Sequence, residues 1–249
     1  MRRHLIIPYT FRMFGNSQPV SSNQDGVHPD LYRLLERHRA APFQKPLSAH
    51  TLQAFDRMRS TWQKAGQPPL VLDAGCGVGW STRQLAQRHP DHLVIGVDQS
   101  AKRLQRGSAS AKGNPANLLL LRADLVDFWR LLETHGMRLS HHYLLYPNPW
   151  PRKQHLGRRW HGHPVFPVIL ALGGELECRS NWSIYLHEFA AALQILSGAA
   201  ATVHAWHPTS GTCLTPFEEK YRASGHGLWR CCTHLPEVSR ARPCAPVLP

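Results

Sequence analysis

No long hydrophobic run occurs in this sequence of 249 residues, although 42% of its residues are hydrophobic. The most extended apolar segments, such as residues 118–121 and 165–172, are much shorter than the ~20 residues that a membrane-spanning helix needs. Near the N-terminus, Pro8 and its polar neighbours interrupt the apolar stretch that a secretory leader would require. The sequence therefore predicts neither a membrane protein nor a secreted one.

The cysteines and histidines lack the spacing that is typical of a cross-linked or metal-bound protein. None of the six cysteines belongs to a CxxC pair or to the even framework of a small disulfide-rich domain. We therefore expect reduced thiols and a cytoplasmic protein. His155, His161 and His163 lie close in sequence, but no nearby cysteine or carboxylate completes a tetrahedral set of ligands. No metal is predicted.

Acidic residues are few in this chain, and one long segment has none. The chain has 16 Asp and Glu against 29 Lys and Arg, which gives a net charge of +13. No acidic residue occurs from residue 134 to residue 174, where five basic residues and six histidines gather. An evenly solvated surface would mix the two signs. This segment therefore favours a patch that faces a polyanion, such as the phosphates of a nucleic acid.

Short apolar strands alternate with helical stretches from residue 70 onward. The expected strands are 70–73, 93–98, 118–122, 142–146, 175–179 and 202–205, and the expected helices between them are 81–88, 101–110, 125–135, 165–172 and 184–197. This alternation predicts an α/β fold, a doubly wound and mostly parallel sheet with helices on both faces. Ligands of such sheets bind outside the carboxyl ends of the strands.

Three segments are expected along the chain. Residues 1–66 form an N-terminal arm and a helical segment, with amphipathic helices at 30–38 and 48–64. Residues 67–235 form the α/β domain, and residues 236–249 form a proline-rich tail. The functional residues should lie in the second segment, just after its strands.

A glycine-rich turn follows the first strand of the α/β domain. Gly75, Gly77 and Gly79 stand between that strand and the next helix, and Asp98 ends the second strand, 19 residues after Gly79. Glycines allow a ligand to approach the backbone closely, and an acid at the end of the second strand can accept both hydroxyls of a ribose. The GxGxxG fingerprint of dinucleotide sites and the GKS or GKT of phosphate loops are both missing. The turn therefore predicts a different nucleotide-like cofactor.

The form D-x-G-x-G-x-G resembles motif I of the class I S-adenosylmethionine-dependent methyltransferases, which have a Rossmann-like fold. The resemblance implies S-adenosylmethionine as the cofactor. It implies that Asp73 and the three glycines hold the methionine part, that Asp98 holds the ribose, and that Ala123 and Asp124 contact the adenine. These residues all follow strands of the predicted sheet.

A proline-rich loop follows the fourth strand. Pro147 and Pro149 flank Asn148 and restrict the backbone on both sides of its amide. Trp150 offers a ring on which a base could stack, and the basic run that follows can contact phosphates. A loop of this composition at the active edge of the sheet favours binding of the substrate.

This loop and two later segments resemble the tRNA (guanine-N7)-methyltransferases, whose hallmark is aromatic-Pro-Asp-Pro-Trp followed by a basic run that ends in Arg-Arg. Residues 179–185 are similar to the family's Thr-Asp-Trp-x-x-Tyr, and residues 215–220 to its Thr-x-Phe/Tyr-Glu. The resemblance, over residues 70–229, implies methyl transfer to N7 of a variable-loop guanine in tRNA. It implies Asn148 as the catalytic residue and, as substrate-binding residues, Trp150, Arg152, Lys153, Arg158, Arg159, Asn181, Thr215 and Glu218.

The sequence departs from the family's pattern at two positions. Asn148 and Asn181 stand where the family has carboxylates. Guanine N7 has a free lone pair at neutral pH, so its methylation needs alignment rather than a general base, and an amide can still accept hydrogen bonds from the guanine edge. Two alternatives stay open: an RNA or DNA methyltransferase with another acceptor atom, such as an exocyclic amine, or a weakly active tRNA-binding module. The sequence leaves monomer and homodimer equally open.

Overall fold

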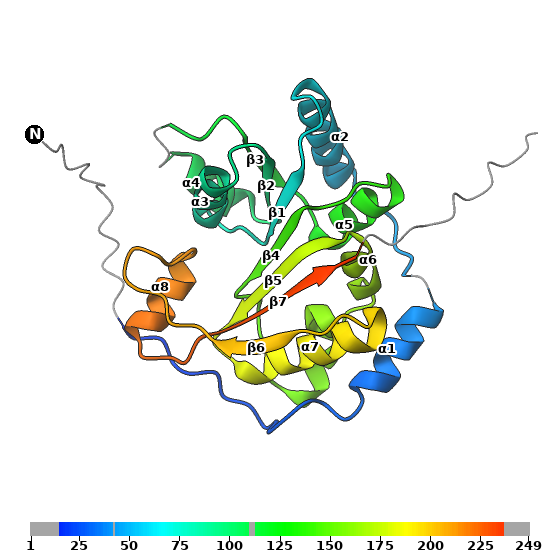
Figure 1. The fold of residues 1–249 in the computed structure, drawn as a ribbon, viewed down its shortest axis with the longest axis vertical. Helices are drawn as coiled ribbons and strands as arrows, with labels where there is room; N and C mark the ends of the chain where they lie inside the picture. The colour runs from blue at the N-terminus through cyan, green and yellow to red at the C-terminus, as the bar shows by residue number, and fades with distance from the viewer. Residues whose placement is uncertain (1–14, 42, 110–112, 237–249) are drawn as a thin grey trace, which may run out of the picture.

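The computed structural model describes residues 15–41, 43–109 and 113–236 and places a seven-stranded mixed sheet at its centre (Figure 1). The strand order is β3-β2-β1-β4-β5-β7-β6. The strands are β1 (Leu70–Ala74), β2 (Leu93–Asp98), β3 (Leu118–Arg122), β4 (His141–Leu145), β5 (Gly174–Ser180), β6 (Thr202–Ala205) and β7 (Trp229–Leu235). The strands β1 to β5 run parallel to one another, whereas β7 is antiparallel to both β5 and β6.

Helices connect most of these strands. They are α1 (Leu31–Ala40), α2 (Ala49–Lys64), α3 (Trp80–Arg88), α4 (Ala101–Ala109), α5 (Leu125–Thr134), α6 (Phe166–Ala171), α7 (Ser183–Ser197) and α8 (Pro216–Ala223), and two short 3-10 helices span Lys153–Arg158 and Trp160–Gly162. The predicted α/β architecture and its strand positions are confirmed. Two elements were missed, the helix α8 and the strand β7.

The strand β7 has one face on the core and one face toward solvent. Cys231, Thr233 and Leu235 are buried, whereas the residues between them are exposed. This alternation is typical of a strand with one face on the core. Because β7 pairs antiparallel beyond β5, it also moves the predicted strand 202–205 to the edge of the sheet, where it forms β6.

The core lies on both faces of the sheet, as alternate residues of β1 show. Leu70 and Leu72 belong to the larger apolar cluster, whereas Val71 packs in a second cluster with Leu85 and Ala86 of α3. Neighbouring side chains on a strand point to opposite faces, so helices cover the sheet on both sides. Every residue of β1 and β2 is buried, as expected of central parallel strands.

The helices α1 and α2 share this core. Leu31 and Leu35 of α1 and Phe55 and Met58 of α2 are buried in the same cluster as the sheet residues. The predicted tail, residues 236–249, lies outside the described residues except for Pro236, and so do the first 14 residues of the predicted arm. Among the described residues, no helix is both long and apolar enough to cross a membrane.

Candidate active site at the carboxyl edge of the sheet

The glycine turn follows β1 and is held against the end of β2. The amides of Gly75 and Cys76 both donate to the carbonyl of Val97, at 2.8 and 3.0 Å. The three glycines have φ angles of 84°, 60° and 71°, a region that disfavours other residues. A Cβ atom added to Gly75 or Gly77 would meet no atom nearer than 4.0 Å, whereas one added to Gly79 would lie 2.9 Å from Leu120. Space for a ligand therefore lies beside the first two glycines, and Gly79 serves packing.

Asp98 stands directly behind this turn. Its side chain is 3% exposed. Its Oδ2 accepts a hydrogen bond from the amide of Gly77 at 2.9 Å, its Oδ1 accepts one from the amide of Ser100 at 2.7 Å, and Arg103 lies 3.3 Å from Oδ1. A carboxylate offers about four acceptor positions. Asp98 can therefore fix the turn and still accept a hydroxyl group of a ligand.

Asp73 has a different environment from Asp98. It is 1% exposed, and its Oδ2 accepts hydrogen bonds from the hydroxyls of Ser81 at 2.6 Å and Thr82 at 2.7 Å. Burial raises the pKa of Asp73 to about 6, against the opposing effect of the two hydroxyl hydrogen bonds. These contacts hold the first turn of α3 to β1. The predicted contact between Asp73 and a cofactor stays a prediction.

The adenine-side residues lie after β3. Ala123 is fully buried, and its amide donates to the carbonyl of Asp98 at 3.2 Å. Asp124 is the N-cap of α5, where its Oδ1 accepts from the amide of Asp127 at 3.2 Å. The hydroxyl of Thr51 on α2 accepts from the amide of Asp124 at 2.9 Å. The structure thus brings the ends of β1, β2 and β3 together at one edge.

The proline-rich loop follows β4, the other neighbour of β1. Tyr146 and Trp150 have positive φ angles of 53° and 44°, which cost on the order of 1–3 kcal/mol each for residues with side chains. Asn148 is exposed, and its Oδ1 accepts a long hydrogen bond of 3.3 Å from the amide of Trp150. Such a strained loop persists only because surrounding contacts hold it.

Arg159 supplies several of those contacts, which corrects one prediction. Its side chain is fully buried, its Nε donates to the carbonyl of Trp150 at 3.2 Å, and its Nη2 donates to the carbonyl of Arg152 at 3.3 Å. The guanidinium also lies over the ring of Trp182, 4.9 Å from the ring centroid. Arg159 was predicted to bind substrate phosphates. The structure instead places the guanidinium in the interior, where it anchors the loop.

The partner of Arg159 is a buried carboxylate on α7. Glu188 is fully buried, forms an ion pair with Nη1 of Arg159, and lies 2.8 Å from Nε2 of His161. Burial would raise the pKa of Glu188, but the hydrogen bonds and charges of His161 and Arg159 outweigh burial and lower that pKa to about 2. The side chain of Gln24 and the amide of His28 also donate to Glu188. Glu188 and Gln24 were not predicted from the sequence, and neither were the contacts of Glu188 with Gln24, Arg159 and His161.

The neighbouring arginine, Arg158, remains on the surface. Its guanidinium lies over one face of the Trp150 ring, 4.8 Å from the ring centroid. Arg152 and Lys153 are exposed as well. Three of the four basic residues predicted to contact phosphates are therefore accessible, and all three follow the exposed Asn148 closely in the chain.

Glu218 was predicted to bind substrate, and the structure corrects this prediction as well. It is fully buried, and its Oε1 accepts from the hydroxyl of Tyr146 at 2.9 Å, from Nε1 of Trp206 at 2.7 Å and from Nη1 of Arg179 at 2.8 Å. A carboxylate so enclosed has no free access to a substrate. Glu218 instead joins α8 to the start of the proline-rich loop.

Thr215 and Asn181 lie in the same region. Thr215 is buried and caps α8, since its hydroxyl accepts from the amide of Glu218 at 2.9 Å, and its predicted substrate contact stays a prediction. Nδ2 of Asn181 lies 3.2 Å from Nδ1 of His226. Asn181 lines a pocket of about 330 Å³ with Trp182, Ser183, Trp229, residues 19–20 and residues 224–227. Asn181 remains accessible.

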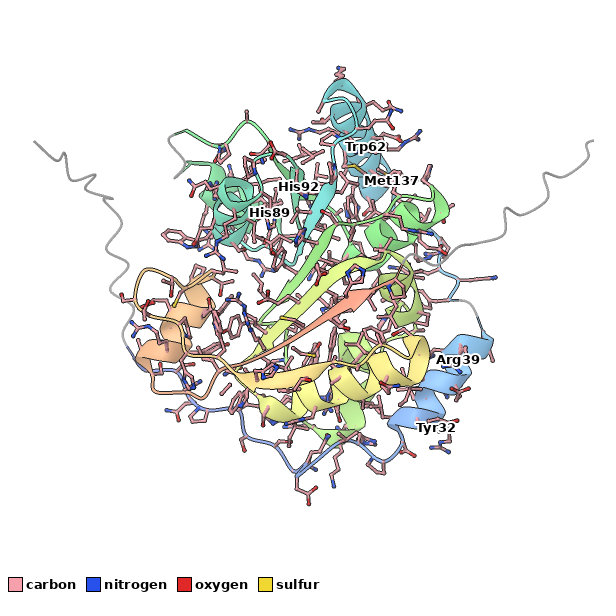
Figure 2. The ribbon with its side chains drawn as sticks, viewed as in Figure 1. Tyr32, Arg39, Trp62, His89, His92 and Met137 are labelled. Atoms are coloured by element: carbon pink, nitrogen blue, oxygen red, sulfur yellow. The ribbon has the colours of Figure 1, made fainter. Side chains whose placement is uncertain are left out.

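A pocket of about 440 Å³ lies at the opposite end of β1. Leu70, Trp62 and Met137 contribute to its lining, and Figure 2 shows the last two close together beside α2. Leu70 is the first residue of β1, whereas the glycine turn follows the last. This pocket is therefore remote from the carboxyl edge, where the candidate site lies.

The comparisons with known proteins agree with this geometry. A family model described as "Putative methyltransferase" matches residues 67–231. The chain belongs to this methyltransferase family. A relative from Cupriavidus pinatubonensis is 24% identical over 241 residues, which are 86% of this chain and 90% of the relative. A relative from Bordetella parapertussis is 30% identical over 175 residues, 66% of each chain. Both are named tRNA (guanine-N(7)-)-methyltransferase, so the resemblance read from the motifs is confirmed.

Solved structures confirm the fold of this methyltransferase. A 16S rRNA (adenine(1408)-N(1))-methyltransferase from Catenulisporales acidiphilia, solved with its cosubstrate SAM, gives a TM-score of 0.53 at 18% identity, over 74% of this chain and 93% of that one. The 16S rRNA methyltransferase KamB gives 0.54 at 19% identity, over 77% and 96%. These likenesses establish a shared architecture, the class I methyltransferase fold predicted from the alternation of strands and helices and from the resemblance to motif I.

Proposed function

We propose that this methyltransferase transfers a methyl group from S-adenosylmethionine to N7 of a guanine in tRNA. The main support for this proposal is the position of two loops, the glycine turn and the loop that contains Asn148. The glycine turn after β1 and the Asn148 loop after β4 follow adjacent parallel strands, so they meet at the same edge of the sheet. The tRNA (guanine-N(7)-)-methyltransferases among its relatives, up to 30% identical, give the acceptor atom.

The residues of the glycine turn fit the cofactor. Open space lies beside Gly75 and Gly77, where an added Cβ would meet no atom nearer than 4.0 Å, and the carboxylate of Asp98 lies behind them. Asp98 would accept the ribose hydroxyls, and the main chain after β3, at Ala123 and Asp124, would border the adenine. When bound, the cofactor supplies a methyl group activated by a sulfonium centre.

Asn148 would position the base. The lone pair of guanine N7 forms the new bond to the methyl carbon while the carbon–sulfur bond breaks, and no proton has to be removed from N7. The Oδ1 atom of the exposed Asn148 would accept hydrogen bonds from the guanine edge and so keep N7 in line with the methyl group. Positioning of this kind is the main contribution that an enzyme can make to such a transfer.

The exposed basic residues of the same loop would hold the RNA backbone. Arg152, Lys153 and Arg158 carry positive charge in a segment of the chain that has no acidic residue, residues 134–174. Phosphate contacts of this kind supply most of the affinity for a nucleic acid and fix its register. Trp150 and Asn181 would contact bases beside them. We expect such an enzyme to act in the cytoplasm, where its tRNA substrate would be found.

A nucleoside assay tests this function. The protein is incubated with S-adenosylmethionine that carries a labelled methyl group and with tRNA lacking the modification, and the digested nucleosides are separated by chromatography. A labelled 7-methylguanosine peak is expected. A labelled adenosine or exocyclic-amine product would overturn the acceptor assignment. Intact cofactor binding without any labelled nucleoside would instead indicate an RNA-binding module.

Variants of Asn148 test the mechanism in single-turnover experiments. Asn148→Ala removes the acceptor and should lower the rate of methyl transfer by about 10²-fold. Asn148→Asp keeps the shape and adds a negative charge beside the cation that develops on the base, so it should retain or raise the rate. Equal rates for the wild type and Asn148→Ala would contradict the positioning role.

A further inference from the structure

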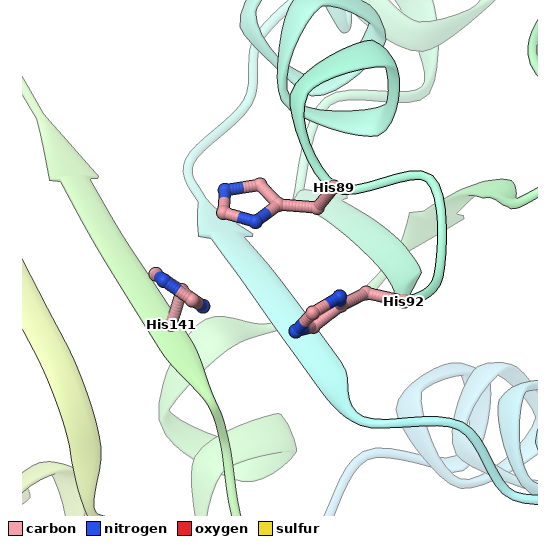
Figure 3. A group of neighbouring side chains, drawn as sticks. All are labelled: His89, His92 and His141. Atoms are coloured by element: carbon pink, nitrogen blue, oxygen red, sulfur yellow. The ribbon is translucent and has the colours of Figure 1, made fainter.

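Three histidines from separate segments meet at the amino ends of the strands, at the opposite end of the sheet from the glycine turn. His89 follows α3, His92 precedes β2 and His141 begins β4. Because β2 and β4 flank β1, the three residues surround the start of that strand. Figure 3 shows their rings turned toward a common space, and Figure 2 places His89 and His92 beside α3. The sequence predicted no metal because this grouping depends on the fold.

The distances among the three rings suit a shared ligand. One nitrogen from each ring lies within 4.8 Å of the others. The ring centroids of His89 and His141 are 4.3 Å apart, those of His89 and His92 are 5.3 Å apart, and those of His92 and His141 are 5.7 Å apart. Imidazoles that bind one tetrahedral metal ion through bonds of about 2.1 Å have centroids about 5 Å apart. Small rotations of these half-buried rings would bring the nitrogens to ligand distance.

Burial and neighbouring groups act on two of the three rings, His89 and His141. Burial, followed by the nearby His141 and His92, lowers the pKa of His89 to about 4. The pKa of His141 is lowered by burial and by His92, against the raising effect of Glu175. Neutral imidazoles have a lone pair for a metal ion, whereas protonated ones do not.

The contacts around the cluster resemble those of a metal site. Nε2 of His89 lies 3.2 Å from the hydroxyl of Tyr143, and Nδ1 of His141 lies 3.2 Å from the hydroxyl of Ser140. Outer contacts of this kind orient the rings of metal-binding histidines. By contrast, Nδ1 of His92 is buried and has no hydrogen-bond partner among the described residues. A buried polar atom without a partner is unfavourable, and a metal ion would stabilise the ring.

We propose that His89, His92 and His141 bind one divalent transition-metal ion of the zinc class. Three imidazole nitrogens suit Zn²⁺, Ni²⁺ or Cu²⁺, whereas Mg²⁺ and Ca²⁺ prefer oxygen ligands. The described residues contribute no carboxylate or thiolate to this group, so a water molecule fills the fourth position. The ion would join the segments that carry His89, His92 and His141, at the opposite end of the sheet from the glycine turn.

Titration of the full chain with the metal alone tests the site. The protein is treated with a chelator, kept reduced, and titrated with ZnCl₂ in a calorimeter, and its Tm is measured with and without Zn²⁺. One equivalent and a rise in Tm are expected, because a ligand that binds only the folded state stabilises it. Titration with Co²⁺ should give a tetrahedral visible spectrum without the ultraviolet band that cysteine thiolates produce. No saturable equivalent, or a thiolate band, would overturn the proposal.

Matched histidine variants complete the test. His89→Gln should remove the bound equivalent and the rise in Tm, whereas His204→Gln, at an exposed position on β6, should keep both. If His89→Gln fails to fold, His92→Gln replaces it, since the ring of His92 makes no hydrogen bond with the described residues. Equal Zn²⁺ binding by the wild type and all variants would show that the ion binds elsewhere.

Discussion

The two loops at the carboxyl edge are held in place in different ways. The glycine turn after β1 depends on neighbours within 23 residues of the chain, from Gly75 to Asp98. The proline-rich loop after β4 depends on side chains of α7 and α8 and on residues 22–24, which lie far away in sequence. The contacts that hold the cofactor turn are thus local in sequence. Those that hold the proline-rich loop, which is the acceptor loop of this methyltransferase, come from much of the fold.

The N-terminal segment illustrates this dependence. The hydroxyl of Ser22 donates to the carbonyl of Pro151 at 2.6 Å, and the amide of Lys153 donates to Asn23 at 3.3 Å. The side chain of Gln24 contacts both Arg159 and Glu188. Residues 22–24 therefore hold the acceptor loop in place from outside the sheet.

The largest effect is expected for the buried pair under the acceptor loop. Arg159→Ala leaves the carboxylate of Glu188 buried without its main partner, and should lower the free energy of unfolding by about 3–5 kcal/mol. Denaturant unfolding followed by circular dichroism measures this loss. The control is Arg158→Ala, next in the chain but exposed, which should change stability by less than about 0.5 kcal/mol. Equal losses in the two variants would contradict the assignment of Arg159 as an anchor.

A smaller effect is expected at the cofactor turn. Asp98→Ala removes a charged hydrogen-bond acceptor and should weaken S-adenosylmethionine binding by ~1.5–3 kcal/mol, which isothermal titration calorimetry can measure. Asp91→Ala, at an exposed position before β2, should leave the affinity unchanged. An unaltered affinity in a folded Asp98→Ala variant would remove Asp98 from the cofactor site.

The two regions should also respond to pH with opposite signs. The pKa of Asp73 is about 6 in the folded protein against an ordinary value of 3.8, so between these values the folded state binds more protons than the unfolded state. Asp73 therefore destabilises the fold above pH 6, and this penalty disappears as the pH falls to about 4. Asp73→Asn should flatten the dependence of the unfolding free energy on pH in this window, by on the order of 3 kcal/mol. An unchanged profile would contradict the raised pKa.

Glu188, under the acceptor loop, gives the unfolding free energy the opposite dependence on pH. Its pKa is about 2 in the folded protein against an ordinary value of 4.5. The stability it contributes is fully present above pH 4.5 and is lost as the pH falls toward 2, because the unfolded state then takes up the proton first. The unfolding free energy of Glu188→Gln, measured over the same pH series, should not fall between pH 4.5 and pH 2. This pH range is lower than the range in which Asp73 acts.

The smallest effect is expected for the exposed arginine. Arg158→Ala should weaken tRNA binding modestly and reduce the slope of log K against log salt by ~0.7–0.9 for one phosphate contact, with cofactor affinity unchanged. Filter binding across a salt series measures the slope, and Arg88→Ala at the end of α3 is the control of equal charge. If both variants give the wild-type slope, Arg158 contacts no phosphate.

Sequence reasoning could predict the strands and the glycine turn because their signals are local. Residues 70–79 carry an apolar strand and three glycines in direct succession, and the turn they predict is the turn observed. It could not separate Arg158 from Arg159. The two are adjacent and identical, and only the buried Glu188, 29 residues away, decides which one faces inward. For the same reason, the histidines around β1 could not be grouped before the topology was known.

The hydrogen bonds of Glu218 have a consequence for the order in which the protein matures during synthesis. The glycine turn has all its partners once residue 100 has left the ribosome. Tyr146, at the start of the acceptor loop, hydrogen-bonds to a carboxylate that lies 72 residues further along the chain. Residues 22–24 are synthesised early, but their partners in residues 151–159 are synthesised much later. The hydrogen-bond partners of the cofactor turn are therefore synthesised long before those of the acceptor loop.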